Sequence, residues 1–124
     1  MDVTEFNINL TSEQPEALIA WYRDVLQLPP SDMGEWAFRV GENTYLVIDG
    51  HSETHGKAKE PQRYLINFMV ENLAAEQARL EALGVEFIRK GGRESWGGVI
   101  STFLDPDGNY LQLLEYKPGE AGEG

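Results

Sequence analysis

The sequence contains no cysteine, and its 10 lysine and arginine residues are outnumbered by 21 aspartate and glutamate residues. Without cysteine the chain cannot form disulfide bonds, use a thiolate in catalysis or build a zinc–thiolate site. The formal net charge of −11 argues against nucleic acid as a partner, because its phosphates would repel the chain. The same charge argues against binding to an anionic membrane surface.

Long apolar runs are also missing. No run approaches the length needed to cross a membrane, and the N-terminus has no charged and apolar signal segment, so we expect a cytoplasmic location. The 124 residues, 41% of them hydrophobic, fit one globular domain able to bury a modest core. Residues 117–124 are rich in glycine and glutamate, and we expect them to form a flexible tail.

The most informative stretch is residues 103–115. Its centre, residues 105–109, combines a proline, which fixes φ, with Gly108, which tolerates positive φ, as in a sharp turn. After this turn, leucines alternate with Tyr110 and Gln112, which is typical of a strand with two different faces. The stretch therefore predicts a strand, a turn and a second strand.

A shorter version of this pattern occurs earlier, in residues 41–48. There, residues 45–48 (Tyr-Leu-Val-Ile) align with residues 110–113 (Tyr-Leu-Gln-Leu). The segments before them repeat as well, because residues 6–10 and 65–70 each have the pattern of a strand that leads into a helix. The sequence therefore predicts a duplicated module.

Helical spacing of apolar residues follows each of these first strands. The first predicted helix ends near Leu28, tolerates Pro15 in its first turn and has Ser12 as its expected N-cap. The second has Asn72 as its expected N-cap and stops at Gly84. The predicted apolar positions are Leu18, Trp21, Tyr22, Val25 and Leu26 in the first helix and Leu73, Leu80 and Leu83 in the second.

Further short strands are predicted after each helix. They cover residues 36–40 and 44–48 in the first half and residues 85–88 and 100–104 in the second. Each half is then β-α-β-β with a final strand, or β-α-β-β-β if a short strand lies near residues 28–33.

The predicted organisation is one domain, residues 1–116. Module one covers about residues 1–50 and module two residues 63–116. Residues 51–62, rich in lysine and histidine and poor in apolar residues, form the loop that links them.

These features together resemble the vicinal oxygen chelate superfamily, which includes glyoxalase I, extradiol dioxygenases, fosfomycin-resistance proteins and bleomycin-binding proteins. The resemblance extends from about Phe6 to Tyr116. It rests on residues 15–22, 70–72, 96–98 and 103–114, in this order and spacing. It implies an α+β fold in which two βαβββ modules form a curled mixed sheet around a shared cleft, with the helices outside. It also implies a homodimer.

Catalytic members of this superfamily usually chelate one divalent metal in the cleft, through histidine, glutamate or glutamine. Carried over position by position, the ligand sites are Asn7, Val47, Leu65 and Gln112. Val47 and Leu65 offer no ligand atom, and two neutral amides cannot offset the charge of a dication. A slip of two residues would offer Glu5, but no register gathers three ionisable ligands. We therefore predict neither a bound metal nor another cofactor.

The two histidines of the chain lie close together in the linker. His51 and His55 flank Glu53, at a spacing that would place both histidines on one face of a helix, but no helical pattern surrounds them. The segment is either a solvated loop or a mobile loop over the cleft in which a histidine touches the ligand.

What remains is a cleft of amides and aromatic rings. Amides can hydrogen-bond a neutral polar ligand through both donor and acceptor, and rings supply flat apolar walls. A single cation could come from Arg39 or Arg93. The predicted ligand-binding residues are Asn7, Asn9, Trp36, Phe38, Tyr45, Asn67, Trp96, Tyr110 and Gln112.

Several of these residues also admit a structural role. Asn9 and Asn67 occupy matching places in the two modules and could simply tie strands together. Tyr45 and Tyr110 could be packing residues of the repeat. Trp96, in a segment expected to be irregular, could cover a loop instead of a ligand.

Three functions are compatible with this pattern. The first is a small-molecule binder of the bleomycin-resistance type without a catalytic metal, and the second is a metal-dependent lyase, isomerase or dioxygenase. The third is an interaction module that kept the fold and lost the chemistry. The missing metal ligands favour the first or the third, and the polar cleft residues favour the first. A metal-free enzyme with Glu5 or Tyr45 as acid or base is also compatible.

Overall fold

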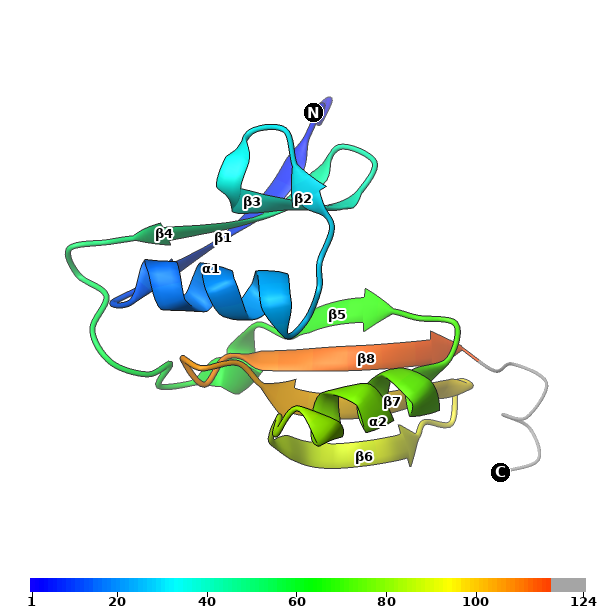
Figure 1. The fold of residues 1–124 in the computed structure, drawn as a ribbon. Coiled ribbons are helices and arrows are strands. Elements are labelled where there is room, and N and C mark those ends of the chain that lie inside the picture. Colours follow the sequence, from blue (N-terminus) through cyan, green and yellow to red (C-terminus); the bar gives the residue numbers. More distant parts are fainter. Residues whose placement is uncertain (117–124) are drawn as a thin grey trace. The chain divides into compact units, whose positions relative to one another are not determined.

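The computed structural model describes residues 1–116 and divides the chain into two compact units, Met1–Gly56 and Lys57–Gly124 (Figure 1). The boundary falls inside the predicted linker, and we keep the names module one and module two for these units. The predicted tail, residues 117–124, lies outside the described residues.

Module one is a βαβββ unit with one four-stranded sheet. Its elements are β1 (Phe6–Ser12), α1 (Pro15–Asp24), β2 (Pro30–Ser31), β3 (Gly34–Gly41) and β4 (Thr44–Gly50). The strand order is β1-β4-β3-β2, with β1 parallel to β4 and the other pairs antiparallel. The short strand expected near residues 28–33 is therefore present as β2.

Module two repeats this plan. After a 3-10 turn, η1 (Pro61–Arg63), its elements are β5 (Ile66–Met69), α2 (Leu73–Ala82), β6 (Phe87–Arg93), β7 (Gly98–Leu104) and β8 (Tyr110–Tyr116). The strand order is β5-β8-β7-β6, with β5 parallel to β8 and the other pairs antiparallel. The α+β fold of two βαβββ modules is confirmed.

The register shows that the two modules correspond residue by residue. Asn9 on β1 pairs with Val47 on β4, and Asn67 on β5 pairs with Gln112 on β8. Asn9 and Asn67 thus do occupy matching places, and Val47 takes the place of Gln112 in module one.

Helix α1 differs from its prediction at both ends. Its N-cap is Gln14 and not the predicted Ser12. The hydroxyl of Ser12 instead accepts a hydrogen bond from the backbone N–H of Gln14, at 2.9 Å. The helix ends at Asp24 and not near Leu28, because Gln27 takes a left-handed φ of 59° and prolines follow. At this exposed end, a hydrogen bond from Arg23 lowers the pKa of the Asp24 carboxyl.

Helix α2 begins as predicted and packs on one face of its sheet (Figure 1). Asn72 caps it by accepting a hydrogen bond from the Ala75 N–H at 3.1 Å. Gly84, with a φ of 85°, ends it. Leu80 is fully buried, but Leu83, predicted on the same apolar stripe, is exposed.

The turn between β7 and β8 is held by one buried carboxylate. Asp105 accepts hydrogen bonds from the backbone N–H groups of Asp107 and Asn109, each at 2.9 Å, and from the Asn109 side chain at 2.8 Å. Gly108 supplies the positive φ of 79° that the turn requires. The predicted turn is confirmed, and it fixes the start of β8.

The two α-helices have 10 residues each, and no helix within residues 1–116 is long and apolar enough to span a membrane.

Candidate functional site

The sheet of module two has one face covered by α2. The backbone N–H of Leu73, at the start of α2, donates to the Glu115 carboxylate at 3.0 Å, and the hydroxyl of Ser101 contacts Gln77 on the helix. Because successive residues of a strand point to opposite faces, the neighbours of Glu115 and Ser101 point away from α2. We call this opposite side the distal face; it carries Asn67, Met69, Arg89, Gly92, Gly98, Ile100, Thr102, Tyr110, Gln112, Leu114 and Tyr116.

One row of the distal face is polar in all four strands. Gln112 on β8 pairs with Asn67 on β5 and with Thr102 on β7, and Thr102 pairs in turn with Arg89 on β6. Residues paired across neighbouring strands project from the same face of a sheet. The side chains of these four residues therefore form one polar row.

The amide of Gln112 is oriented by its neighbour in this row. Its Nε2 donates to the Thr102 hydroxyl oxygen at 2.9 Å, and the two residues are only 8% and 5% exposed. No buried side-chain nitrogen or oxygen in residues 1–116 lacks a hydrogen-bond partner. The hydrogen bond to Thr102 uses Nε2 of Gln112, so it leaves the acceptor capacity of Oε1 unused.

Two aromatic rings lie further along the distal face, beyond Ile100 and Leu114. Trp96 and Tyr116 are stacked, with ring centroids 6.3 Å apart and an interplanar angle of 26°, and they are 51% and 54% exposed. Gly98 is the β7 partner of Tyr116, and a Cβ at residue 98 would overlap the Trp96 ring. The Trp96 ring thus lies over the Gly98 backbone on the distal face. We call Trp96 and Tyr116 the aromatic pair.

Trp96 lies in a hydrogen-bonded turn, within the segment that the sequence predicts to be irregular. The Glu94 N–H donates to the Gly98 carbonyl at 2.7 Å, and the Gly97 N–H donates to the Glu94 carbonyl at 3.0 Å. These bonds close a hairpin between β6 and β7. The sequence concealed it because two glycines adjoin the tryptophan.

An ion pair at this end of the distal face was missed entirely. Nη1 of Arg89 lies 2.8 Å from Oε1 of Glu94, and a Cβ at residue 92 would overlap the guanidinium. The guanidinium therefore lies over the Gly92 backbone. Strand β6 continues to Arg93, well past the predicted residues 85–88, and its two glycines look like a loop in the sequence.

Three of the predicted residues of module one, Asn7, Asn9 and Tyr45, share the corresponding face of their own sheet. Asn7 pairs with Tyr45, and Asn9 pairs with Val47. Both asparagines are exposed, and Nδ2 of Asn7 donates to the Glu5 carboxylate at 3.0 Å. This face therefore offers two amides and a half-buried tyrosine.

Two predicted aromatic residues of module one have different surroundings. Phe38 is buried in the core of the module, with its ring centroid 6.4 Å from that of Tyr22 on α1. Trp36 is partly exposed. Its indole lies against Gly34, so that a Cβ at residue 34 would overlap the ring. Phe38 is thus on the helix side of its sheet, out of reach of a ligand on the other face.

The four positions carried over from metal-binding relatives do not suit a metal. Val47 and Leu65 have hydrocarbon side chains, the Gln112 amide is held by Thr102, and Asn7 is an exposed neutral amide. No group of three or more histidine, aspartate or glutamate side chains in residues 1–116 is arranged to hold a metal ion. The donors present therefore do not fit a divalent catalytic metal.

The two linker histidines are separate and exposed. Nδ1 of His51 accepts a hydrogen bond from the Glu53 N–H at 3.1 Å, and Nδ1 of His55 lies 3.8 Å from Oε1 of Glu13. The two imidazoles thus have different partners.

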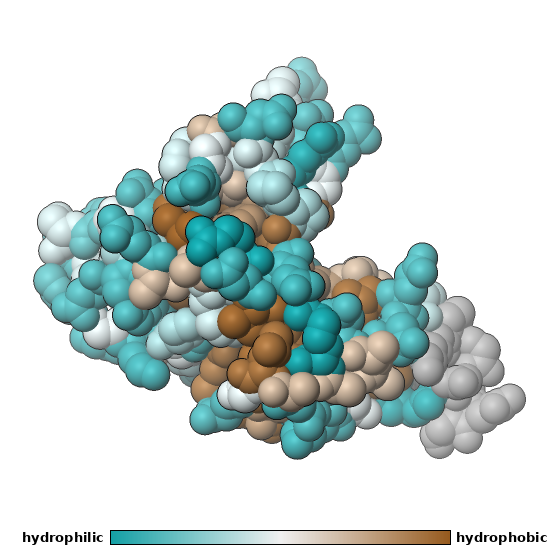
Figure 2. All heavy atoms as spheres, viewed as in Figure 1, coloured by the Kyte–Doolittle hydropathy of each residue, from teal (hydrophilic) through white to brown (hydrophobic). Residues whose placement is uncertain are grey.

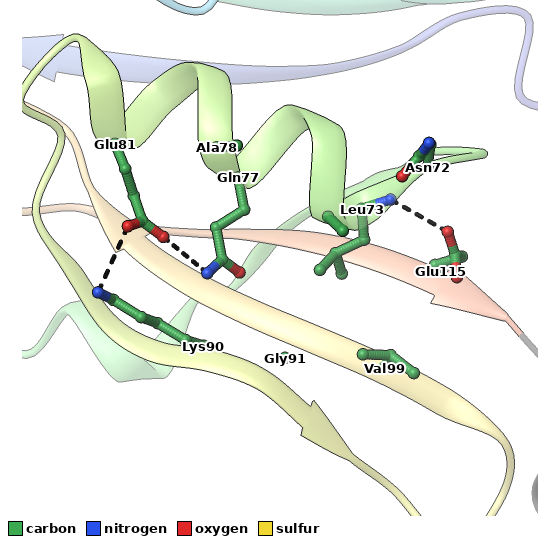
Figure 3. A pocket seen from close by; sticks show the side chains of 10 residues that line it. Asn72, Leu73, Gln77, Ala78, Glu81, Lys90, Gly91, Val99 and Glu115 are labelled. Carbon is green, nitrogen blue, oxygen red and sulfur yellow. Dashed lines mark hydrogen bonds and ion pairs between the residues drawn. The ribbon is translucent and has the colours of Figure 1, made fainter.

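A groove of about 390 Å³ lies on the α2 side of the sheet (Figure 3). We call it the α2 groove. Its polar side chains bind one another: Nε2 of Gln77 donates to Glu81 at 2.7 Å, and Nζ of Lys90 lies 3.5 Å from the other Glu81 oxygen. None of the residues predicted to bind ligand lines this groove. The molecular surface seen from this side mixes apolar and polar side chains (Figure 2).

Solved structures share this fold. A glyoxalase/bleomycin resistance protein/dioxygenase from Nocardioides is 18% identical, with a TM-score of 0.70 over 96% of this chain and 87% of that chain. A superfamily member from Sphaerobacter thermophilus is 16% identical, with a TM-score of 0.70 over 92% and 98%. A protein of unknown function from Agrobacterium tumefaciens is 22% identical, with a TM-score of 0.71 over 93% and 95%.

No curated protein matches the chain in sequence. The family model of the Glyoxalase/Bleomycin resistance protein/Dioxygenase superfamily, in contrast, matches residues 6–113. This match covers both modules, from β1 to the middle of β8. The chain belongs to the Glyoxalase/Bleomycin resistance protein/Dioxygenase superfamily.

Proposed function

We propose that the chain binds a small planar organic molecule on the distal face of module two, without a catalytic metal. The observation that carries this proposal is the amide of Gln112. Thr102 fixes its orientation, and two exposed aromatic rings lie further along the same face, beyond Ile100 and Leu114. An oriented polar group next to large apolar surfaces is the usual composition of a small-molecule site.

Each part of this site has a distinct task. Oε1 of Gln112 accepts a hydrogen bond from an N–H or O–H group of the ligand, and this bond sets the orientation of the ligand. The aromatic pair supplies flat apolar surface for a ring, and a favourable ring–ring contact contributes about 0.5–1.5 kcal/mol beyond the area that it buries. Ile100 and Leu114, paired on the same face, add apolar surface between these two parts.

Two further features belong to this proposal. The superfamily resemblance suggests a homodimer, and the composition suggests a cytoplasmic protein. The alternative function is a metal-dependent lyase, isomerase or dioxygenase, which would need metal ligands other than the four positions considered above.

Module two contains a matched pair of glutamines for the test. Gln112 bonds a threonine hydroxyl on the distal face, and Gln77 bonds a serine hydroxyl on the α2 side of the same sheet. A thermal-shift screen of planar aromatic antibiotics and metabolites would supply a ligand. Its dissociation constant would then be measured by the quenching of tryptophan fluorescence.

We expect Gln112→Ala to weaken this ligand about tenfold, because it removes a hydrogen bond worth about 1.4 kcal/mol. Gln77→Ala should leave the affinity unchanged, although it lowers the melting temperature by removing a partner of the buried Ser101. Equal affinities of wild type and Gln112→Ala would refute the proposed site.

A further inference from the structure

We infer that Arg89 selects ligands that carry an acidic group, and that the ligand carboxylate replaces Glu94 as the partner of the guanidinium. This inference rests on the proposed function, because it assigns a substrate class to the same distal face. It starts from one ion pair, in which Nη1 of Arg89 lies 2.8 Å from Oε1 of Glu94.

The position of Arg89 suits a ligand held by Gln112. Arg89 is the β6 partner of Thr102, which is the β7 partner of Gln112, so two strand spacings separate the two residues. Neighbouring strands lie about 4.8 Å apart, which gives roughly 10 Å between the two backbones. Both side chains project from the distal face and the guanidinium extends over Gly92, so one aromatic ring with a polar group at each end can contact both the acceptor and the cation.

Gly92 leaves room for the guanidinium of Arg89 to lie against the backbone of β6. A Cβ at residue 92 would overlap Nε, Cζ and Nη2 of Arg89, so the guanidinium occupies the space that a side chain would fill. Gly92 is the β6 partner of Ile100, one of the apolar residues of the site. The charged group therefore lies next to the apolar surface on which a ligand ring would rest.

The carboxylate of Glu94 is a replaceable partner. The side chains of Arg89 and Glu94 are 41% and 33% exposed, and an ion pair this accessible to water adds little to stability. Guanidinium presents five N–H donors in a fixed fork and binds a carboxylate best through two parallel hydrogen bonds. A ligand carboxylate aligned by Gln112 could form both bonds, so the exchange favours the ligand.

The net charge of −11 does not favour an anionic ligand at long range. Ions in solution screen such repulsion beyond about 8 Å at physiological salt, whereas a direct contact is screened less. Selection of an acid therefore has to come from a local cation, and Arg89 is the cation of the polar row.

The next residue provides a matched control. Lys90 points to the opposite face, where Nζ lies 3.5 Å from Oε2 of Glu81 at the α2 groove (Figure 3). Arg89→Gln and Lys90→Gln remove the same charge from adjacent positions. An effect of net charge on ligand affinity should appear in both variants. The loss of a direct contact with the ligand should appear only in Arg89→Gln.

The test compares 4-hydroxybenzoate with its neutral isostere 4-hydroxybenzamide. Each probe is titrated into ¹⁵N-labelled protein, and the dissociation constant is read from the indole N–H signal of Trp96. Wild type should bind the acid about tenfold more tightly than the amide. Arg89→Gln should reduce this ratio to about one, and Lys90→Gln should keep it. Glu94→Gln should tighten the acid severalfold, whereas Glu81→Gln should not.

Two results would overturn the inference: a wild-type acid-to-amide ratio near one, including the absence of binding by both probes, or a ratio that Arg89→Gln leaves unchanged. Failure of the proposed function looks different. If both probes bind equally and Gln112→Ala weakens both, only the acid preference fails. If both bind with affinities independent of Gln112 and Trp96, the proposed site fails as well.

Discussion

Tryptophan covers a glycine at two places in this chain, Trp96 over Gly98 in module two and Trp36 over Gly34 in module one. Both indoles are about half exposed. Of the two, Trp96 has a stacked partner, Tyr116, and shares its face of the sheet with the oriented amide of Gln112. Trp96 and Trp36 can therefore be compared directly, because each packs on a glycine but only Trp96 has a proposed role in binding.

We predict that Trp96→Ala weakens the ligand from the screen at least tenfold and changes the melting temperature by only a few degrees. The indole adds little to stability because half of it is already exposed, but it supplies much of the apolar surface of the site. Trp36→Ala is the control and should keep full affinity. Isothermal titration calorimetry and a melting curve of each variant would check both. A large loss of stability with unchanged affinity would assign Trp96 to structure.

The sequence predicted the face of the sheet correctly for some side chains and not for others. Strand alternation correctly separates Gln112 from the leucines beside it, because the pleat alone decides that separation. It does not decide which of the two sets faces the helix. Phe38 therefore looked like a candidate for the ligand site although it packs against Tyr22 in the core. Arg89 was missed because register shifts within β6 hide its face from any simple alternation.

The hairpin between β6 and β7 positions Trp96, and the end of β8 supplies its partner Tyr116. Its turn is closed by two hydrogen bonds between Glu94 and the glycines 97 and 98. Gly98 both ends the turn and leaves room for the indole. The position of Trp96 on the distal face thus depends on the absence of a side chain two residues later.

We predict that Gly98→Ala displaces the Trp96 ring and weakens the ligand severalfold, because the added methyl group would overlap the indole. The fluorescence emission of the tryptophans should change at the same time. Gly41→Ala, at the end of β3, is the control, since an added methyl group there meets only ordinary contacts with Thr44. Unchanged emission and affinity in Gly98→Ala would contradict the position assigned to the ring.

Elements defined by turn chemistry were predicted best. The cap by Asn72, the stop at Gly84 and the turn around Asp105 each depend on local hydrogen bonds or φ values that the residue type reveals. Tertiary hydrogen bonds left no such signal. Glu115 accepts a hydrogen bond from the backbone N–H of Leu73 at the start of α2, 42 residues away in sequence. No local sequence pattern near either residue predicts this bond.

The chain as a whole shows its duplication in sequence and in structure. Each module has the same order of strands and a parallel pair formed by its first and last strand. The modules differ where chemistry is expected, because Val47 takes the place of Gln112. Duplication can be predicted from pattern, but the proposal of a site in module two needed the hydrogen bond between Gln112 and Thr102 and the stacking of Trp96 on Tyr116.

Metal content is the property of the purified protein that separates the two leading functions. We predict that untagged protein purified without a chelator contains well below one metal ion per chain, because Val47 and Leu65 cannot ligate and Gln112 is already held by Thr102. Elemental analysis by mass spectrometry would measure this ratio. Near-stoichiometric nickel, zinc, manganese or iron would contradict the prediction and would redirect work to lyase and dioxygenase assays.

The location of the bound ligand is the central claim. It is tested most directly by a titration of ¹⁵N-labelled protein with the tightest ligand from the screen, followed through side-chain N–H signals. We predict the largest shifts at the amide of Gln112 and the indole of Trp96, with small shifts at Gln77 and Trp36. The largest shifts at Gln77, beside the α2 groove, or at Trp36, in module one, would contradict the claim.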